Sequence, residues 1–249
     1  SGVLYFANYL RSGTIGQYNT TELAPPTTFI DLNEWITSFK KNSLNLHGLA
    51  VDSEGRLVGA DAGTGKVVRI SPNASKVEIL ADSYQGMLLQ SVHDVALSPD
   101  GTVYVSSAEE GVVYRIQPDE GKVDIVNQDL IWADGLAISP DGSRLVVTEP
   151  DAARLLVFSL QNDSFGGFPA AKLDFSDASD TPHDVAFDES GLLYVAMGNL
   201  GLVHVFDLPE NRLLQTYDVG GSVNRLLPSN GTLWFSGGKT EGLRSIRLN

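Results

Sequence analysis

The chain has 249 residues, of which 42% are hydrophobic, enough to bury the core of one large domain spanning residues 1–249. Its 17 Lys and Arg against 31 Asp and Glu give a net charge of −14, which makes nucleic acid and anionic membranes unsuitable partners. The absence of cysteine excludes disulfides, thiolate nucleophiles and cysteine-based zinc sites.

The N-terminal stretch, residues 3–31, predicts three short strands in the segments VLYFANY, GTIGQYN and TTFIDL. The segment 33–43, NEWITSFKKNS, is the one plausible short helix. Beyond it the chain has almost no helical periodicity, and Val, Ile, Leu, Tyr and Phe dominate its apolar runs. The composition of the elements therefore predicts an all-β fold.

From residue 47 onward one pattern recurs: a polar residue, a short apolar strand, a turn with Gly and a second apolar strand. The copies begin 46, 41, 49 and 41 residues apart, which is the spacing of propeller blades. A third apolar strand follows each pair, and a fourth follows in most repeats, as a four-stranded blade requires. The copies occupy residues 47–61, 93–107, 134–149, 183–197 and 224–238.

These repeats predict a six-bladed β-propeller with four-stranded antiparallel blades. The three N-terminal strands correspond to strands two, three and four of a further blade whose first strand is not in the sequence. The last repeat has no fourth strand. We therefore expect the first and last blades to be incomplete, and the ring of blades to be closed by fewer strands than usual.

The first residue of each repeat lies at the start of the strand that lines the propeller channel, so these residues form a ring at one mouth. Three of the four histidines fall on this ring, whereas His204 lies in a third strand, in the middle of a blade. Imidazoles and a carboxylate that converge on one axis can ligate a metal or transfer protons. A ring that binds only water and neighbouring backbone is the alternative. The ring residues are His47, His93, Asp134, His183 and Asn224.

Other polar or aromatic side chains lie next to this ring in the sequence. Asp94 and Asp184 directly follow ring histidines and would point the opposite way on a regular strand. We expect them to make local hydrogen bonds in turns, with support of metal ligands as the alternative. Arg225 is ambiguous in the same way, and we expect Trp132 to pack between blades rather than line the mouth.

The loops on the ring side of the propeller include long connections at 31–46, 80–92 and 174–182. Loops of this length over a channel mouth are candidate lids. The first of them carries Trp35, Phe39, Lys40 and Lys41. Polar residues that end second strands face the same rim, and these are Asp61, Ser107 and Glu149.

The motifs resemble the senescence marker protein/gluconolactonase family, which includes regucalcin and related lactonases, over nearly the whole chain. The segment DGLAISPDGSRLVVTE is similar to that family's "NGLA.SPDG" motif, the most specific match. HDVALSPDGTVYVSS resembles its "NDV" motif, and HDVAFDESGLLYVA resembles its "DGM" motif. The resemblance implies a six-bladed propeller with a divalent cation, often calcium, in the channel.

The resemblance also implies which residues would surround that cation. The Asn of the NGLA motif falls on Asp134, the Asp of the DGM motif on His183 and the Asn of the NDV motif on His93, while the family's Glu ligand has no counterpart. Calcium prefers oxygen ligands, so the histidines favour zinc or another transition metal. The histidine-rich channel also resembles that of peptidyl-amidoglycolate lyase, whose "PHGL"-type motifs place zinc ligands. A third possibility is that metal binding has been lost and the pocket does something else.

The resemblance implies a hydrolase of the gluconolactonase type, which opens a lactone or similar ester with the help of a metal that polarises the carbonyl. We expect Asp134 and His93 to be catalytic, and Asp134, His183 and His93 to hold the metal. The residues expected to contact substrate are His47, Asn224 and Arg225. Two alternatives stay open: a non-catalytic propeller that binds a small molecule or a protein, and a metal-free lyase or cyclase that uses the channel histidines.

We expect a monomer whose partner is a small-molecule substrate, with neither nucleic acid nor membrane as a partner. No apolar run approaches the roughly 18 residues of a membrane span. Sequons for N-glycosylation favour a secreted or extracytoplasmic protein over a cytoplasmic one. They begin at Asn19, Asn73, Asn162 and Asn230.

Overall fold

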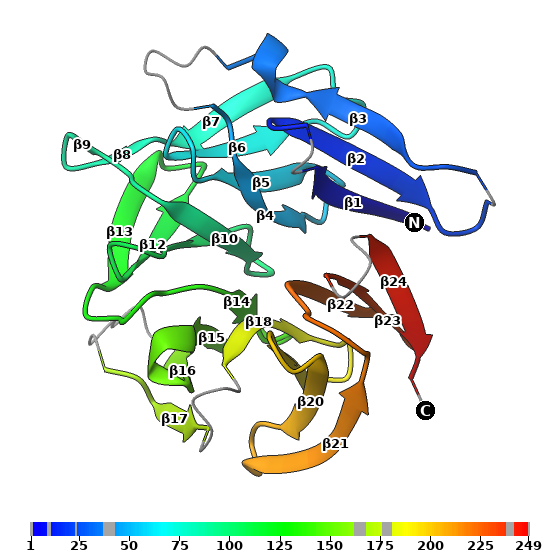
Figure 1. Ribbon diagram of the computed structural model, residues 1–249. Helices are drawn as coiled ribbons and strands as arrows, with labels where there is room; N and C mark the ends of the chain where they lie inside the picture. The colour runs from blue at the N-terminus through cyan, green and yellow to red at the C-terminus, as the bar shows by residue number, and fades with distance from the viewer. Residues whose placement is uncertain are drawn as a thin grey trace.

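The computed structural model shows an all-β molecule in which successive sheets are arranged around a central axis, which we call the channel axis of the propeller (Figure 1). The structure describes residues 2–8, 11–22, 24–36, 43–161, 168–175, 181–237 and 242–248. In these residues the only helical elements are two 3-10 turns, η1 (Leu32–Glu34) and η2 (Pro150–Ala152). The predicted helix over 33–43 is therefore a single 3-10 turn in its described part, and 37–42 lie outside the described residues.

Four complete blades carry four antiparallel strands each, in simple chain order. Blade 2 comprises β4 (Leu46–Val51), β5 (Leu57–Asp61), β6 (Lys66–Ile70) and β7 (Val77–Ala81). Blade 3 comprises β10 (Val92–Leu97), β11 (Val103–Ser107), β12 (Val112–Gln117) and β13 (Lys122–Asn127). Blade 4 comprises β14 (Leu136–Ile138), β15 (Arg144–Glu149), β16 (Arg154–Ser159) and β17 (Ala171–Asp174). Blade 5 comprises β18 (Pro182–Phe187), β19 (Leu193–Met197), β20 (Leu202–Asp207) and β21 (Arg212–Asp218).

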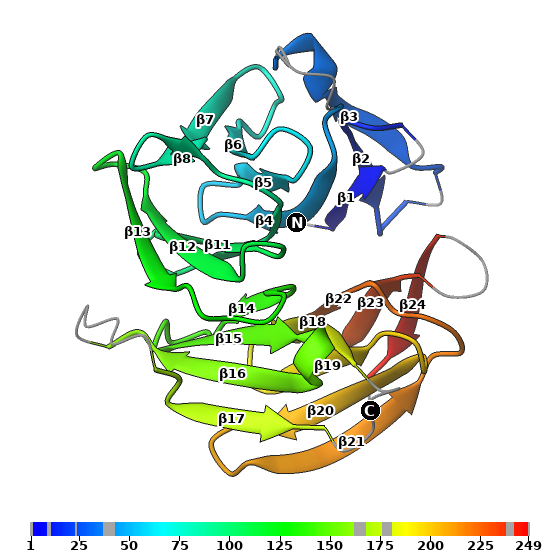
Figure 2. The same ribbon diagram turned by 60° about the vertical axis from the view of Figure 1, so that its left-hand side comes forward.

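The first and last blades have three strands each, as the sequence predicts. Blade 1 comprises β1 (Val3–Asn8), β2 (Thr14–Asn19) and β3 (Thr27–Asp31). Blade 6 comprises β22 (Arg225–Ser229), β23 (Thr232–Ser236) and β24 (Leu243–Arg247). Figure 2 shows the two incomplete blades next to one another, with blade 1 beside blade 2 and blade 6 beside blade 5.

Strand β1 has the direction of a second strand, which confirms the assignment made from the sequence. Ser12, in the turn between β1 and β2, donates a hydrogen bond to the carbonyl of Leu44, in the loop that leads into β4. That loop lies on the ring side, so β1 runs toward the ring side just as β5 and β11 do. An edge contact between Tyr18 and Trp234, with ring centroids 6.5 Å apart, joins blade 1 to blade 6.

The hydrophobic core lies between the blades rather than at a single centre. Five apolar clusters are each shared by two successive blades, from blades 1 and 2 to blades 5 and 6. Because a neighbouring blade covers both faces of the second strands, every residue of β5, β11 and β19 is buried. The outer strand β21 is almost entirely exposed. This explains why second strands read as continuous apolar runs instead of alternating ones.

The turns between first and second strands lie at the far end of each blade from the ring and are structural. In blade 3, Gly101 adopts a φ of 87° and its N–H bonds the carbonyl of Ser98 at 2.9 Å. The repeated SPDG turns therefore supply a left-handed residue that closes each hairpin.

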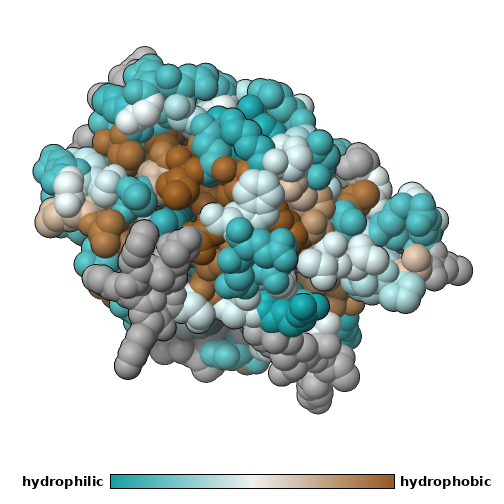
Figure 3. Space-filling model, turned by 90° about the horizontal axis from the view of Figure 1, so that it is seen from above, coloured by the Kyte–Doolittle hydropathy of each residue, from teal (hydrophilic) through white to brown (hydrophobic). Residues whose placement is uncertain are grey.

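A connection between blades forms a small ribbon of its own, β8 (Ser83–Tyr84) paired with β9 (Met87–Leu88). Figure 3 looks onto the part of the molecule that lies uppermost in Figure 1, where hydrophobic residues reach the surface between hydrophilic ones. No helix in the described part of the chain has the length and hydrophobicity needed to cross a membrane.

Candidate functional site

The inner strands β4, β10, β14, β18 and β22 converge around the channel axis (Figure 1). The first residue of each repeat lies at or just before the start of its inner strand, at the same end of the propeller. His47, His93 and His183 lie inside their strands, whereas Asn224 directly precedes β22 and Asp134 lies two residues before β14. We call these five residues the first ring. The residue that follows each of them belongs to the second ring, which comprises Gly48, Asp94, Gly135, Asp184 and Arg225.

The carboxylate of Asp134 lies between two imidazoles of the first ring. Its Oδ1 is 2.7 Å from Nδ1 of His93, and its Oδ2 is 3.3 Å from Nδ1 of His183. The His93 nitrogen is buried, and its close contact with Asp134 is an ion-pair contact outside hydrogen-bond geometry. Three blades thus contribute one carboxylate and two histidines to a single cluster.

The charge state of Asp134 follows from these neighbours. Burial works to raise the pKa of Asp134, whose residue is 6% exposed. The contacts from His183 and His93 and the positive charge of Arg225 outweigh that effect and hold the pKa of the carboxyl below its usual range. Asp134 is therefore an ionised partner that orients the imidazoles on either side of it.

Two buried hydroxyls fix the backbone around Asp134, and the sequence analysis did not single them out. Ser106 accepts the N–H of Asp94 at 3.0 Å and donates to the carbonyl of Asp134 at 2.7 Å. Thr148 accepts the N–H of Gly135 at 2.7 Å and donates to the carbonyl of His183 at 3.0 Å. Each hydroxyl therefore joins one blade to the next. Their signal in the sequence is a hydroxyl in an otherwise apolar second strand.

His47 extends the cluster on the other side of His93. The two rings lie 4.3 Å apart, tilted by 44°. The side-chain N–H of Asn45 donates to Nε2 of His47 at 2.8 Å, so this nitrogen is an acceptor. Burial, then the charges of His93 and Arg225, lower the pKa of His47 to about 4, with Asp134 opposing them. His47 is thus neutral near pH 7.

The other first-ring residue expected to contact substrate is Asn224. Its side chain is exposed, and its backbone N–H bonds the carbonyl of Ser236 at 2.9 Å. The predicted roles of Asn224 and His47 toward a substrate stay predictions. His204 is separate, as expected, and contacts the rings of Phe175 and Phe206 on the outer side of the blade.

The second ring corrects the expectation that Asp94 and Asp184 make local turn contacts. Asp94 accepts the N–H of Leu136 in the next blade at 2.9 Å, and Asp184 accepts the N–H of Leu226 in the next blade at 2.7 Å. Both also face the guanidinium of Arg225, whose Nη1 is 3.3 Å from Asp94 Oδ2 and 3.1 Å from Asp184 Oδ1.

The reason for the error is an irregularity in the strand pairing. The register shifts between Val92 and Val95 in β10 and between Pro182 and Asp184 in β18, where each strand has one residue more than its partner. A bulge of this kind breaks the alternation of side chains. A side chain that would point away from the channel on a regular strand can then point toward it. Both the ring residue and the residue after it can then reach the channel.

Residues at the ends of the second strands hold the ring-side loops in place. Asp61 accepts the N–H of Asn45 at 2.6 Å, Ser107 donates to the carbonyl of Gln90 at 2.6 Å, and the buried Glu149 accepts the N–H of Ile131. These loops lead directly into the first ring. The three residues are therefore structural supports of the site and not part of its lining.

Trp132 differs from the expectation that it packs between blades. It is 41% exposed and has a φ of 55°, a left-handed conformation that is uncommon for a bulky residue. It lies two residues before Asp134, on the ring side. Of the predicted lids, 37–42, with Phe39, Lys40 and Lys41, and 176–180 lie outside the described residues.

The residues expected to hold a metal do not surround a common point. In the described ranges, no group of three or more His, Asp or Glu side chains is arranged to hold a metal ion. The Nδ1 atoms of His93 and His183 face the two oxygens of Asp134, and Nε2 of His183 lies 3.2 Å from the Thr181 hydroxyl. This arrangement does not fit a metal centre, and the metal at Asp134, His93 and His183 stays a prediction.

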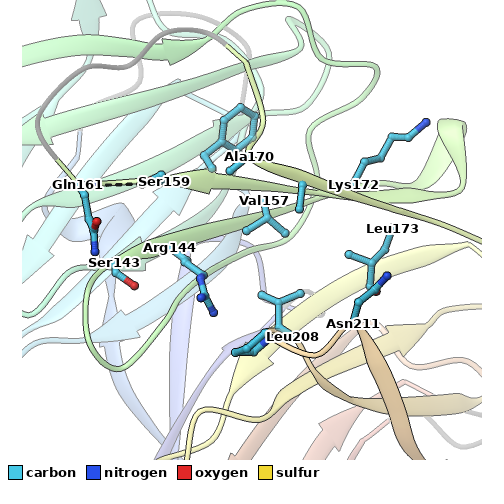
Figure 4. A pocket seen from close by; sticks show the side chains of 13 residues that line it. Ser143, Arg144, Val157, Ser159, Gln161, Ala170, Lys172, Leu173, Leu208 and Asn211 are labelled. Carbon is cyan, nitrogen blue, oxygen red and sulfur yellow. Dashed lines mark hydrogen bonds between the residues drawn. The ribbon is translucent and has the colours of Figure 1, made fainter.

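A hollow of about 450 Å³ lies elsewhere, between the outer part of blade 4 and the β20–β21 turn of blade 5 (Figure 4). Its floor includes Val157 and Leu173, and the side chains of Arg144 and Lys172 stand at its edge. None of the first-ring or second-ring residues lines it. The hollow is therefore separate from the channel cluster.

The fold and the cluster define a six-bladed propeller with charged and imidazole groups at one channel mouth. A family model described as the SMP-30/Gluconolactonase/LRE-like region matches residues 72–227, and the chain belongs to this family. No curated protein matches the chain. The family membership confirms the resemblance stated from the sequence.

Solved structures with the same fold have diverse functions. A gluconolactonase from Xanthomonas campestris is 21% identical, with a TM-score of 0.78 over 99% of this chain and 82% of that one. A chain of a nidogen/laminin complex is 15% identical, with a TM-score of 0.77 over 99% and 89%. An inactive histidine-to-alanine variant of virginiamycin B lyase from Staphylococcus aureus, with quinupristin, is 12% identical, with a TM-score of 0.70 over 99% and 77%. These likenesses establish the fold, which serves a hydrolase, a binding complex and a lyase.

Proposed function

We propose that this protein is a hydrolase of the gluconolactonase type that opens a lactone or a similar ester at the mouth of the channel. Membership of the SMP-30/gluconolactonase family supports the class of reaction. The observation that carries the proposal is the carboxylate of Asp134 held between His93 and His183. A carboxylate that orients an imidazole is the arrangement by which proteins make a general base near neutral pH.

In the proposed reaction His93 is the base and Asp134 is its orienting partner. Asp134, ionised because its pKa is held low, faces Nδ1 of His93 and leaves Nε2 to take a proton from water. The hydroxide oxygen bonds to the carbonyl carbon, the ring C–O bond of the lactone breaks, and the proton returns from His93 to the departing alkoxide. Water supplies the hydroxyl group of the acid and the hydrogen of the alcohol, so no further reactant is needed.

The other residues of the two rings have supporting roles in this proposal. His47, neutral at working pH, and Asn224 contact the substrate beside His93. Arg225 offers guanidinium N–H groups to the carbonyl oxygen, where negative charge develops. Its side chain is 28% exposed, so donors that Asp94 and Asp184 do not use are accessible from the channel.

A metal-free lyase is the second candidate, and one comparison favours it. Virginiamycin B lyase shares the fold, and its described histidine-to-alanine variant is catalytically inactive. The same His93 base could remove a carbon-bound proton and eliminate the ester oxygen. Product analysis in ¹⁸O-labelled water separates the two reactions, because hydrolysis places one labelled oxygen in the acid and elimination places none.

The direct test is a panel of five- and six-membered lactones and simple esters assayed with Asp134→Asn and His93→Ala. We expect kcat to fall by about 100-fold or more in both variants because the base loses its orientation or is absent. His204→Ala, in the middle of blade 5, is the matched control and should keep full activity. Full activity in both ring variants, or no hydrolysis of any lactone by the wild type, would overturn the proposal.

A further inference from the structure

The guanidinium of Arg225 lies across the channel between carboxylates from two other blades. Arg225 is on β22 in blade 6, and Asp94 is on β10 in blade 3, on the opposite side of the six-bladed ring. A distance of 3.3 Å between Arg225 Nη1 and Asp94 Oδ2 therefore means that the two side chains meet within the channel. The same Nη1 donates a hydrogen bond to Asp184 Oδ1 at 3.1 Å, from the neighbouring blade 5.

Both carboxylates are held in place by groups other than Arg225. Asp94 and Asp184 are 6% and 4% exposed, and backbone N–H groups of Leu136 and Leu226 bind one oxygen of each. Such fixed, buried carboxylates around one position require a cation, because two unpaired charges in the protein interior repel each other and are poorly solvated.

Two glycines of the second ring make room for Asp94 and Asp184, because any side chain at their positions would collide with these residues. A Cβ on Gly48 would lie 2.3 Å from Oδ1 of Asp94 and 2.6 Å from its Cα. A Cβ on Gly135 would lie 2.9 Å from the Cα of Asp184. Neither glycine has a positive φ, so close approach of the inner strands, and not backbone conformation, accounts for them. The second ring thus consists of two carboxylates, one guanidinium and two residues without side chains.

We infer that Arg225 is the resident cation of this channel: its guanidinium occupies the carboxylate pair Asp94 and Asp184, which would otherwise hold a divalent cation. The natural protein then binds no calcium or zinc at this pair. The positive charge that a metal would supply is instead part of the chain. A guanidinium remains charged at any physiological pH and keeps several N–H donors in a fixed plane. The inference about metal binding does not depend on the proposed hydrolysis, whereas polarisation of a carbonyl by Arg225 does.

The experiment compares calcium and zinc binding by the wild type and Arg225→Ala, using calorimetric titration and the melting temperature. We expect no stoichiometric binding at Asp94 and Asp184 in the wild type. In Arg225→Ala we expect one calcium ion per chain and a rise in Tm of about 5 °C or more at millimolar calcium, because binding to the folded state alone stabilises it. Adding Asp94→Asn to Arg225→Ala should abolish both effects.

The matched control is Arg154→Ala, which removes a guanidinium from one buried carboxylate, that of Glu149, outside the channel. It should gain no calcium response, since a single carboxylate lacks the second acidic ligand. If Arg225→Ala folds only when calcium is present during refolding, that dependence itself supports the inference. Stoichiometric calcium or zinc binding by the wild type that Asp94→Asn removes would overturn it, as would a soluble, folded Arg225→Ala without any calcium response.

A second, independent observation concerns the loops at the ring-side mouth. Several large apolar side chains are exposed on loops that lead into the first ring or turn beside it. Their exposures are 44% for Trp35, 69% for Met87, 55% for Leu88, 52% for Ile131, 41% for Trp132 and 45% for Leu200. Glu149 holds the backbone of Ile131 through its carboxylate, so the left-handed Trp132 is presented by a supported loop.

We propose that Ile131 and Trp132 bind an apolar substituent on the substrate, so that the preferred lactone or ester carries an alkyl or aromatic group. This proposal rests on the proposed hydrolysis. Ile131 and Trp132 belong to the loop that leads directly into Asp134. A chain with a net charge of −14 is poorly suited to the alternative of an anionic lipid surface.

The test is a series of γ-lactones with alkyl chains of increasing length, compared with the polar gluconolactone. We expect kcat/KM to rise about threefold or more for each two CH₂ groups, and Trp132→Ala to remove most of that rise without abolishing turnover of the shortest lactone. Leu213→Ala is the control, because Leu213 is 49% exposed but lies on the outer strand β21.

A rate that is independent of chain length, with gluconolactone turned over best, would overturn the apolar preference and leave the hydrolase proposal intact. Binding of the protein to neutral phosphatidylcholine vesicles that Trp132→Ala removes would also overturn it, because the apolar side chains would then serve a lipid surface. Failure to hydrolyse any lactone would instead overturn the hydrolase proposal.

Discussion

The two rings of the channel are one residue apart in the sequence and differ in chemistry. The first ring carries three histidines, Asp134 and the exposed Asn224, and its imidazoles are partly accessible from the mouth. The second ring carries Asp94, Asp184 and Arg225 in a buried ion-pair arrangement. The difference teaches that the first ring holds groups suited to proton transfer, while the second ring holds the blades together and provides a fixed positive charge.

The strongest test of this division is the stability of Arg225→Ala measured by urea unfolding without added metal. Removing the guanidinium leaves Asp94 and Asp184 buried without a counter-charge, so we expect the free energy of unfolding to fall by about 3–5 kcal/mol. Arg212→Ala, whose side chain is 65% exposed in its ion pair, should change it by less than about 1 kcal/mol. Equal losses of unfolding free energy in the two variants would contradict the structural role assigned to the second ring.

The glycines test the close packing of the inner strands. Gly48→Ala places a methyl group against the backbone and carboxylate of Asp94, and we expect a loss of about 1–3 kcal/mol of stability. Gly59→Ala is a suitable comparison, because its new Cβ meets side-chain ends and no backbone: those of Leu46 and Leu49 at 3.2 Å and that of Val68 at 3.7 Å. If thermal melting gives the same loss of stability for both variants, the second ring does not specifically require glycine at position 48.

The hydroxyl of Ser106 connects the two rings, since it binds the N–H of Asp94 and the carbonyl of Asp134. Ser106→Ala leaves both groups buried without this partner, and we expect a cost of about 1–3 kcal/mol. If Ser106 also positions the base, kcat should fall in Ser106→Ala while KM stays the same. Ser98→Ala, in the far turn of the same blade, should do neither.

The smallest expected effect is the pH dependence of stability that His47 of the first ring contributes. Burial and nearby positive charge lower the pKa of His47 from 6.5 to about 4, so folding favours its neutral form. The wild type should lose stability relative to His47→Asn as the pH falls through this range, because the unfolded chain takes up the proton first. Melting temperatures of the wild type and His47→Asn between pH 4 and pH 7.5 measure this slope, and parallel curves would contradict the assignment.

Much of the fold was predictable because propeller blades repeat. The spacing of the copies that begin at His47 and His93, and the Gly in each turn, indicated four-stranded blades and two incomplete ones. The cluster of His93, Asp134 and His183 followed from their equivalent positions. Equivalent positions in a closed ring must converge, so no knowledge of side-chain packing was needed.

The second ring was not predictable in the same way. Asp94 and Asp184 were assigned to local turns by strand alternation, and a register shift in β10 and β18 overrides that alternation. Ser106 and Thr148 were missed because a hydroxyl in a buried strand has no periodic signal. Their partners, the carbonyls of Asp134 and His183, belong to neighbouring blades and are not near them in the chain.

The sequence by itself determined the propeller, the number of blades and the identity of the residues at the channel mouth, because these depend on repetition. Only the tertiary structure decided that Arg225 meets Asp94 and Asp184 across the channel and that Asp134 lies between two imidazoles. The physical reason is that these contacts join different blades. Their geometry depends on bulges, on glycines that admit close approach and on how the blades pack, none of which a pattern within one repeat records.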